Sequence, residues 1–426
     1  LGGDGDDTLE DGSGDGTLRG GAGDDTFLIE PGGDGRFTAL RDGGEGRDRL
    51  LLPGGGLDFE FRGAAITGIE DLVLTASDGG GFTLRFDGAS FPFERVIFED
   101  FGAVVTIDIF GGGTSLPDLS QIVFDGFTEG HDRVRIHGGP GADRLYGTVY
   151  SDEILPSNGG DTILASEGQD TIRSGNGRKV LSYAERAGPV VVDMPARTAL
   201  WDGHLTVFET LRDVYGSTGG DLMIGGATGA RLWGEDGDDT LYGSWSDNVR
   251  GGPGDDLYIV EGNPIVFEDA DEGHDTIRAD IDLYFMPGRV EVLELFRDDA
   301  KGVGTWGDDL LRGDAGAQDL LGNRGNDTLD GGGGRDTLTG DEGDDVYILS
   351  DTLARLRERG GEGRDRIEAS ISFTLPNEFE DLLLTGTAVE GRGNAVANLI
   401  VGNASDNILR GEGGADTLEG GGGAAA

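Results

Sequence analysis

The chain has 426 residues, no cysteine, and a formal net charge of −49 from 82 acidic and 33 basic side chains. This charge argues against a nucleic-acid partner, because binding to phosphates needs clustered lysine and arginine, and the lack of cysteine excludes disulfides and thiolate metal sites. Its 83 glycines are nearly three times the usual share of about 7%, which indicates that turns recur along the whole chain.

A nine-residue unit opens the chain and returns along it. Residues 2–10 read GGDGDDTLE, with glycine at positions one and four, aspartate at position six and an apolar residue at position eight. Glycine tolerates positive φ, so the first six residues predict a tight turn, and the last three predict a short strand. Units of this form begin at Gly20, Gly138, Gly234 and Gly251, and five run in frame from Gly304 to Ile348.

The apolar residue at position eight predicts the core. Its neighbours in a strand point to the opposite side, and stacked units can bury what a single unit cannot. Two units form one coil, so each unit lies on the second unit after it along the chain. Position eight is held by Leu9, Phe27, Leu145, Leu241, Leu311, Leu329, Leu338 and Leu418.

The carboxylates at position six predict metal sites. Adjoining coils lie about 4.8 Å apart, and two carboxylates about 5 Å apart repel by roughly 3 kcal/mol at an effective dielectric constant of 20. A cation bound between the coils replaces this repulsion by attraction to both carboxylates. Calcium fits, since it takes about six to eight oxygen ligands and carbonyls of the glycine turns can complete its shell. Magnesium demands tighter octahedral geometry.

Several calcium ions are therefore expected, with position six supplying carboxylates and position four marking the turns that supply carbonyls. The predicted aspartates are Asp7, Asp25, Asp143, Asp152, Asp161, Asp170, Asp221, Asp239, Asp256, Asp309, Asp327, Asp336, Asp345 and Asp416. The predicted glycines are Gly5, Gly23, Gly141, Gly237, Gly254, Gly307, Gly325, Gly334 and Gly343.

Spacing predicts which aspartates share an ion. The pairs two whole units apart are Asp7 with Asp25, Asp143 with Asp161, Asp152 with Asp170, Asp221 with Asp239, Asp309 with Asp327, and Asp327 with Asp345. The spacing of Asp239 and Asp256 is one residue short of two units, which predicts a distorted site. Other residues take position six at Gly16, Lys179, Ala230, Gln318, Asn398 and Asn407. Of these, Lys179 and Ala230 cannot ligate an ion.

Longer units interrupt the repeats. Three begin at Phe27, Tyr258 and Tyr347, and each contains one repeat-like turn whose aspartate could complete a site: Asp48, Asp275 and Asp365. Alternating and β-branched runs in 52–126 and 183–215 predict strands. They form either rungs without calcium or, for 52–126, a separate small β-domain. Residues Leu353 to Arg359 are the candidate for a helix.

These features divide the chain in order. Glycine-rich repeats are expected in 1–51 (with one long unit), 127–182, 216–259, 304–348 and 393–426, where the last repeat is truncated. Between them lie the calcium-free segment 52–126, the strand insert 183–215, and the long units 260–303 and 349–392. The chain begins and ends inside repeats, so we expect a fragment of a longer protein.

The pattern G-G-x-G-x-D-x-U-x resembles the calcium-binding nonapeptide of the RTX (repeats-in-toxin, haemolysin-type) family. This resemblance implies an all-β, right-handed parallel β-roll or β-solenoid with calcium-binding nonapeptide turns. It also implies a bacterial protein that is secreted or held at the cell surface, and export by type I (ABC) secretion machinery. The expected function is a structural, secretion-assisting or adhesion module that folds on binding extracellular calcium. Cell-surface or polysaccharide partners are left open.

No catalytic motif is found. The chain lacks H-E-x-x-H and G-x-S-x-G, and His131 and His274 stand at position five of turns, so we expect no enzyme. The alternative is a carbohydrate-active enzyme (lyase, epimerase or hydrolase) on 52–126 that uses Asp108, Asp118 and Asp125 as paired carboxylates. No apolar run reaches the roughly 18 residues of a membrane-spanning helix.

Overall fold

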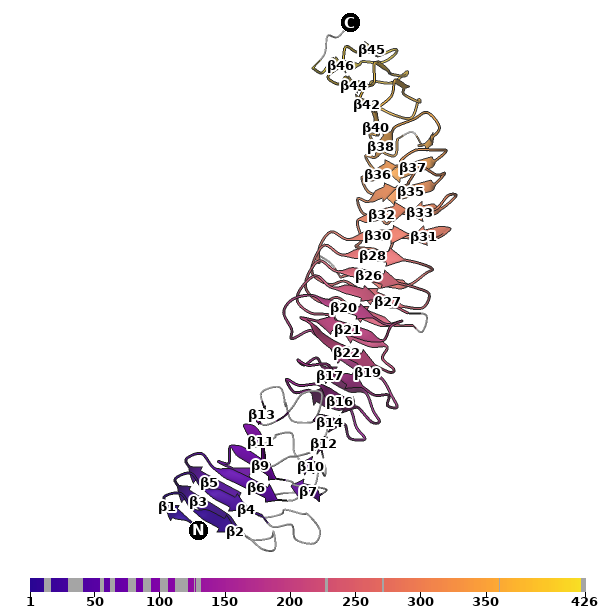
Figure 1. Ribbon diagram of the computed structural model, residues 1–426. Helices are drawn as coiled ribbons and strands as arrows, with labels where there is room; N and C mark the ends of the chain where they lie inside the picture. Colours follow the sequence, from indigo (N-terminus) through magenta and orange to yellow (C-terminus); the bar gives the residue numbers. More distant parts are fainter. Residues whose placement is uncertain are drawn as a thin grey trace. The chain divides into compact units, whose positions relative to one another are not determined.

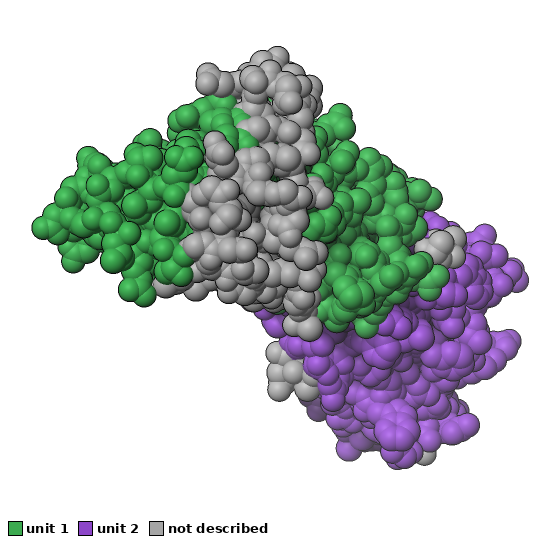
Figure 2. Space-filling model, turned by 90° about the horizontal axis from the view of Figure 1, so that it is seen from below, with its two compact units in different colours: residues 1–217 green, residues 218–426 purple. Residues whose placement is uncertain are grey.

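The computed structural model describes residues 1–10, 17–29, 41–53, 57–61, 66–75, 82–86, 93–99, 106–111, 122–125, 127, 132–226, 229–269, 272–359 and 361–422. The described residues form strands and turns with no helix, and so no helix that could span a membrane. The chain divides into two compact units, Leu1–Ser217 and Thr218–Ala426 (Figure 2). Each unit is a parallel β-solenoid whose strands stack in rows (Figure 1).

Four rows build the first unit. One row contains β1 (Gly3–Asp4), β3 (Leu18–Ala22), β5 (Arg41–Glu45) and β8 (Ile66–Thr67). The row beside it contains β2 (Thr8–Glu10), β4 (Thr26–Leu28), β6 (Arg49–Pro53), β9 (Asp71–Thr75), β11 (Arg95–Glu99) and β13 (Val123–Asp125). The third contains β7 (Leu57–Phe61), β10 (Phe82–Phe86), β12 (Thr106–Gly111), β14 (Arg133–His137), β16 (Asp152–Leu155), β18 (Thr171–Ile172) and β22 (His204–Phe208). The fourth contains β15 (Arg144–Tyr146), β17 (Asp161–Leu164), β19 (Lys179–Ser182) and β23 (Asp213–Tyr215).

The second unit has one long row faced by three short ones. The long row contains β24 (Leu222–Ile224), β26 (Thr240–Gly243), β28 (Leu257–Val260), β30 (Thr276–Ala279), β32 (Val292–Leu295), β34 (Leu310–Arg312), β36 (Thr328–Asp330), β38 (Val346–Leu349), β40 (Arg366–Ala369), β42 (Asp381–Leu384), β44 (Leu399–Val401) and β46 (Thr417–Glu419). The short rows are β25 (Arg231–Trp233), β27 (Asn248–Arg250) and β29 (Ile265–Phe267); β31 (Leu283–Phe285), β33 (Lys301–Val303), β35 (Asp319–Arg324), β37 (Thr337–Glu342) and β39 (Arg355–Arg357); and β41 (Phe373–Thr374), β43 (Glu390–Arg392) and β45 (Ile408–Arg410).

The register of the rows confirms the two-unit coil. Leu311 pairs with Leu329, and Leu329 with Tyr347, so each step spans two nonapeptides. All three side chains are fully buried, so position eight builds the core as predicted. Leu9 and Leu418 are less buried, with Leu418 46% exposed, because β2 and β46 are the outermost strands of their rows.

The longer units change the length of a coil but keep its strand pairing. Each of the three coils is longer than two nonapeptides by a different amount, as shown by the pairs Thr26 with Arg49, Leu257 with Thr276, and Val346 with Arg366. The expectation of a helix at Leu353 to Arg359 is wrong. This segment contains β39, which pairs in parallel with β37, so tertiary pairing overrides its helical pattern.

The two segments without the glycine code form strands within the first unit. In 52–126, β9 pairs with β6 and β11, and β12 pairs with β10 and β14, all in parallel. In 183–215, β20 (Val190–Asp193) and β21 (Thr198–Trp201) form an antiparallel hairpin, and β21 pairs antiparallel with β22. The row then resumes, because β22 pairs in parallel with β18.

Candidate metal sites in the glycine turns

The position-six aspartates form hydrogen-bonded ladders along the turns. The backbone N–H of Asp309 donates to Asp327 Oδ1 at 2.8 Å, and that of Asp327 donates to Asp345 Oδ1 at 2.7 Å. All six pairs predicted from the two-unit spacing make this contact, at 2.7–3.0 Å. The fold therefore brings these carboxylates together in the predicted order.

Ladder contacts also form where the spacing or the residue type departs from the pattern. Asp239 N–H donates to Asp256 Oδ1 at 2.8 Å, so the shortened step leaves this contact undistorted. Asp336 and Asp416 accept from the backbone N–H groups of Gln318 and Asn398, both at 3.0 Å. These two aspartates thus face an amide side chain where the others face a carboxylate.

The long units extend the ladders and end them on a glutamate. The contacts continue from Asp25 to Asp48, from Asp256 to Asp275, and from Asp345 to Asp365, at 2.7–3.1 Å. Each of these turn aspartates then donates its N–H to a glutamate carboxylate: Asp48 to Glu70, Asp275 to Glu291 and Asp365 to Glu380. These glutamates are not predicted by the nonapeptide pattern. Their shared signal is a place at the start of the apolar segments IEDLVL, VEVLEL and FEDLLL.

Within the ladders, one carboxylate oxygen is often left over. Six buried aspartates accept a ladder hydrogen bond at Oδ1, and no described residue is hydrogen-bonded to their Oδ2: Asp25, Asp48, Asp239, Asp256, Asp327 and Asp345. In Asp143, Asp152 and Asp309, by contrast, Oδ2 accepts from the N–H of the same turn. A buried polar atom without a partner is rare and costly, so these oxygens are the groups that a bound cation would satisfy.

Glycine at position one leaves room beside these oxygens, because it has no Cβ. The place where a Cβ of Gly20 would stand lies 2.0 Å from Asp25 Oδ2 and 2.4 Å from the carbonyl oxygen of Gly43. The same place on Gly234 lies 1.7 Å from Asp239 Oδ2 and 2.7 Å from the Gly251 oxygen. A carboxylate and a carbonyl of the next coil therefore converge above a glycine, which is the oxygen-rich environment that calcium prefers.

Most position-four glycines adopt backbone angles that other residues avoid. Seven of the nine predicted glycines have φ between +104° and +149°: Gly5, Gly23, Gly237, Gly254, Gly325, Gly334 and Gly343. Gly141 and Gly307 are not in this region. A Cβ on Gly343 would lie 1.7 Å from the Gly325 carbonyl oxygen, so glycine also allows successive turns to approach closely.

Lys179 provides a direct test of whether a cation fits. Its buried ammonium Nζ lies 2.7 Å from Asp161 Oδ2, 2.9 Å from the Gly159 oxygen and 2.6 Å from the Asn176 oxygen. The sequence excludes Lys179 as a ligand, and the structure places its ammonium among oxygens of successive coils. One carboxylate and two turn carbonyls surround this positive charge, which is the donor set predicted for calcium.

Burial makes several ladder carboxyls weak acids. It raises the pKa of Asp239, Asp256 and Asp327 to about 8, that of Asp345 to about 7, and that of Asp309, Asp275 and Asp365 to about 6. Neighbouring carboxylates add to the effect: Asp345 and Asp309 both raise the pKa of Asp327. A proton or a cation is therefore needed to offset the buried charge.

A pH dependence follows for the calcium-free chain. These carboxyls have a higher pKa in the folded state than the value near 3.9 expected after unfolding, so the folded state binds more protons. Its stability is thus greatest at acid pH and is lost as the pH rises through about 6 to 8. We expect the urea midpoint in excess chelator to fall between pH 5 and pH 8.5. A midpoint that rises over this interval would contradict the assignment.

The two described acids of the carbohydrate-active alternative lie in different rows. Asp108 lies on β12 in the third row, with Oδ1 2.6 Å from His137 Nε2, whereas Asp125 lies on β13 in the second row, 3.6 Å from an Arg95 nitrogen. Gly16, Asp118 and His131 lie outside the described residues. His274 is exposed, as expected of a turn residue.

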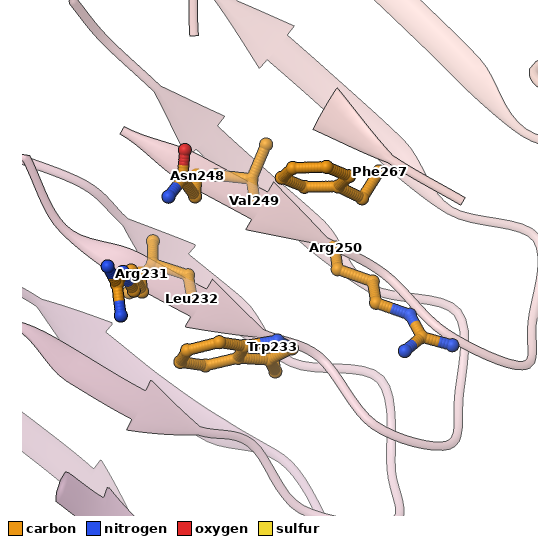
Figure 3. A pocket seen from close by; sticks show the side chains of 7 residues that line it. All are labelled: Arg231, Leu232, Trp233, Asn248, Val249, Arg250 and Phe267. Carbon is orange, nitrogen blue, oxygen red and sulfur yellow. The ribbon is translucent and has the colours of Figure 1, made fainter. Parts of the chain in front are cut away.

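One groove of about 220 Å³ lies on the short row β25, β27 and β29 (Figure 3). Trp233 and Phe267 stand on its outer strands, in register with Arg250 on the middle strand. The Arg250 guanidinium is held by Asp269 at 2.6 Å and Glu272 at 2.8 Å. No acid is among the described residues that line the groove, so it offers no carboxylate pair for glycoside hydrolysis.

Comparison with known proteins identifies the repeats. A family model described as "RTX calcium-binding nonapeptide repeat (4 copies)" matches residues 1–35, 132–154, 156–178, 215–249, 303–318, 313–347 and 392–424. Two curated proteins of Rhizobium meliloti (strain 1021) share a stretch of 59 residues: the endo-1,3-1,4-beta-glycanase ExsH at 42% identity and the endo-1,3-1,4-beta-glycanase EglC at 39%. Each match covers 14% of this chain and 13% of the glycanase.

Proposed function

Because the chain carries RTX calcium-binding nonapeptide repeats folded as a parallel β-solenoid, we propose that it is a secreted module that folds on binding extracellular calcium. The position-six aspartates are the carboxylate ligands, and the carbonyls of the glycine turns complete each site. The module serves a structural, secretion-assisting or surface role and is not itself catalytic. The glycanase activity named for the two relatives is theirs, and their short matches assign none to this chain.

The partnerless Oδ2 atoms of the buried ladder carry this proposal. Asp327 illustrates it: its side chain is fully buried, its Oδ1 is bonded to Asp309, and its Oδ2 has no partner. The Lys179 ammonium supports the same conclusion, since it fills an equivalent position with a positive charge. Both observations point to a cation between coils.

Secretion fits the calcium requirement that these sites imply. Extracellular calcium modules commonly have dissociation constants of about 10⁻⁴ to 10⁻³ M, far above the free calcium of a cytosol. The chain would therefore remain unfolded inside the cell and fold after export. Type I machinery is the export route that the repeat family implies.

The two aspartates Asp327 and Asp336 provide the test. Asp327 has acidic neighbours on both sides in its ladder, Asp309 and Asp345. Asp336 has Gln318 on one side, and on the other the next residue, Thr337, pairs with Arg355, so the residue that corresponds to Asp336 there is Ala354. We expect Asp327→Ala to remove two calcium ions and Asp336→Ala to remove one at most, as counted by calorimetric titration.

The pair is its own control, because both substitutions remove one buried carboxylate and the same formal charge. A purely electrostatic effect of the acidic chain predicts equal losses. Equal losses, or a larger loss for Asp336→Ala, would show that ions do not bridge carboxylates of successive coils.

A further inference from the structure

Two clusters of three carboxylates combine a pair of ladder aspartates with a glutamate outside the nonapeptide pattern. One contains Asp256, Glu268 and Asp275, and in each cluster the ligand oxygens lie within 4.8 Å of one another. Asp256 and Asp275 precede β28 and β30, neighbouring strands of the long row (Figure 1), while Glu268 follows β29. The long unit thus brings a third carboxylate to a pair of ladder aspartates.

The second cluster repeats this arrangement further along the long row. It contains Asp345, Glu358 and Asp365, which stand before β38, after β39 and before β40. In both clusters the glutamate lies seven residues before the turn aspartate. None of the matched repeat segments contains Glu268 or Glu358.

Both clusters present oxygens that no described residue satisfies. Asp256 and Asp345 are each 1% exposed, and the Oδ2 atom of each has no hydrogen-bond partner. The Oε2 atoms of Glu268 and Glu358 also lack a partner. Each cluster therefore directs at least two partnerless oxygens toward a common space among negative charges.

A buried tyrosine positions each glutamate. The Tyr258 hydroxyl donates to Glu268 Oε1 and accepts from the Gly251 N–H at 2.5 Å. Tyr347 binds Glu358 Oε1 in the same way and accepts from the Gly340 N–H at 2.6 Å. With Oε1 held by the tyrosine, Oε2 remains available for another ligand.

The third long unit differs at both positions. Phe27 stands two residues after Asp25, where Tyr258 follows Asp256 and Tyr347 follows Asp345, and phenylalanine has no hydroxyl. Seven residues before Asp48 stands Arg41, whose side chain is 2% exposed. In this unit, therefore, a buried guanidinium takes the sequence position of the glutamate, and the tyrosine hydroxyl is missing as well. Among the three long units, two have both the tyrosine and the glutamate, and the third has neither.

We propose that each Tyr-Glu cluster binds one calcium ion through three carboxylates, and that these two sites bind calcium more tightly than the two-carboxylate sites of the ladders. This inference rests on the proposed calcium-binding function and assigns the long units a role in it. The long units supply the sites that fill first when calcium is limiting.

Geometry and charge both favour calcium here. With Ca–O distances of about 2.3–2.6 Å, oxygens on opposite sides of one ion are separated by about 4.8 Å, the upper limit within each cluster. Affinity in oxygen-ligand sites increases with the number of charged ligands. A third carboxylate, held in place by tyrosine, therefore gives a tighter site than two.

Calorimetric calcium titration of the whole chain tests the proposal with Glu268→Gln, Glu358→Gln and the double variant. Glutamine retains an oxygen that can accept the tyrosine hydrogen bond, so the fold is kept while the charge is lost. We expect two tight ions in the wild type, one in each single variant and none in the double variant. The affected site weakens by roughly tenfold or more.

Glu261→Gln is the matched control, since it removes the same charge from an exposed residue of the same long unit. It should leave both tight sites unchanged. Tyr258→Phe removes no ligand but frees the glutamate, so it should weaken one tight site without changing the total number of ions bound.

The outcomes separate this inference from the proposed function. If the wild type binds calcium and the Glu268→Gln and Glu358→Gln titrations match that of Glu261→Gln, the clusters are not tight sites, while the ladder sites stand. If the wild type binds no calcium, the proposed function fails as well.

Discussion

Removal of calcium with excess chelator at pH 8 is expected to convert the folded chain into an expanded, disordered one that has lost its β-sheet circular dichroism. The formal net charge of −49 and an aromatic content of 7% are typical of chains that do not fold unaided. Folding also buries rows of aspartates that repel one another, such as Asp309, Asp327 and Asp345. Above about pH 8, protons no longer neutralise these rows.

A calcium titration in circular dichroism measures this effect, with an expected midpoint of about 10⁻⁴ to 10⁻³ M. Two controls separate bound ions from general screening. Magnesium at the same concentration should restore little structure, because it demands tighter octahedral geometry. Potassium chloride at about 0.5 M screens exposed charges but should not refold the chain. A complete β spectrum in chelator would show that folding does not depend on calcium.

The second large effect is expected from Gly325→Ala, which should lower the free energy of unfolding in saturating calcium by about 3 kcal/mol. Gly325 has φ +109°, where a side chain is strained, and its Cβ would lie 2.3 Å from the Gly307 carbonyl oxygen. Neither the strain nor the backbone clash can be relieved without separating two coils. Urea unfolding at a fixed calcium concentration measures the loss.

Gly307→Ala is the control at the same repeat position. Gly307 is outside the positive-φ region, and the nearest atom to its Cβ would be Thr305 Oγ1 at 3.6 Å. This substitution should change stability by no more than about 0.5 kcal/mol, as at ordinary surface positions. If the two variants are equally stable, close stacking of the turns is not what requires glycine at Gly325.

The coil and its ladder could be predicted because each repeat encodes them locally. Glycine at positions one and four, aspartate at six and an apolar residue at eight determine the turn, the ladder residue and the core within a single nonapeptide. Because the period is constant, it also determines which residue of the next coil lies beside a given residue. The register of Leu311 on Leu329 and the contact of Asp309 with Asp327 therefore follow from counting residues.

Counting residues does not predict the contacts of coils whose length varies. Glu70, Glu291 and Glu380 end their ladders at steps of different length, so no single period finds them. Glu268 and Glu358 stand outside the glycine turns, and their role depends on a tyrosine ten or eleven residues earlier. The strand at Arg355–Arg357 is set by its pairing with β37, which local sequence does not specify.

The Lys179 ammonium gives the first unit one coil whose counter-charge is part of the chain. A tethered charge has a fixed local concentration, so this coil closes at a rate independent of dissolved ions, whereas a coil bridged by metal must wait for an ion to diffuse in. In a linear array, each added coil gains an interface with the one already formed. We therefore expect the coil of Asp161 and Lys179 to form first within the first unit, and the ion-dependent coils of that unit to add to it as calcium becomes available.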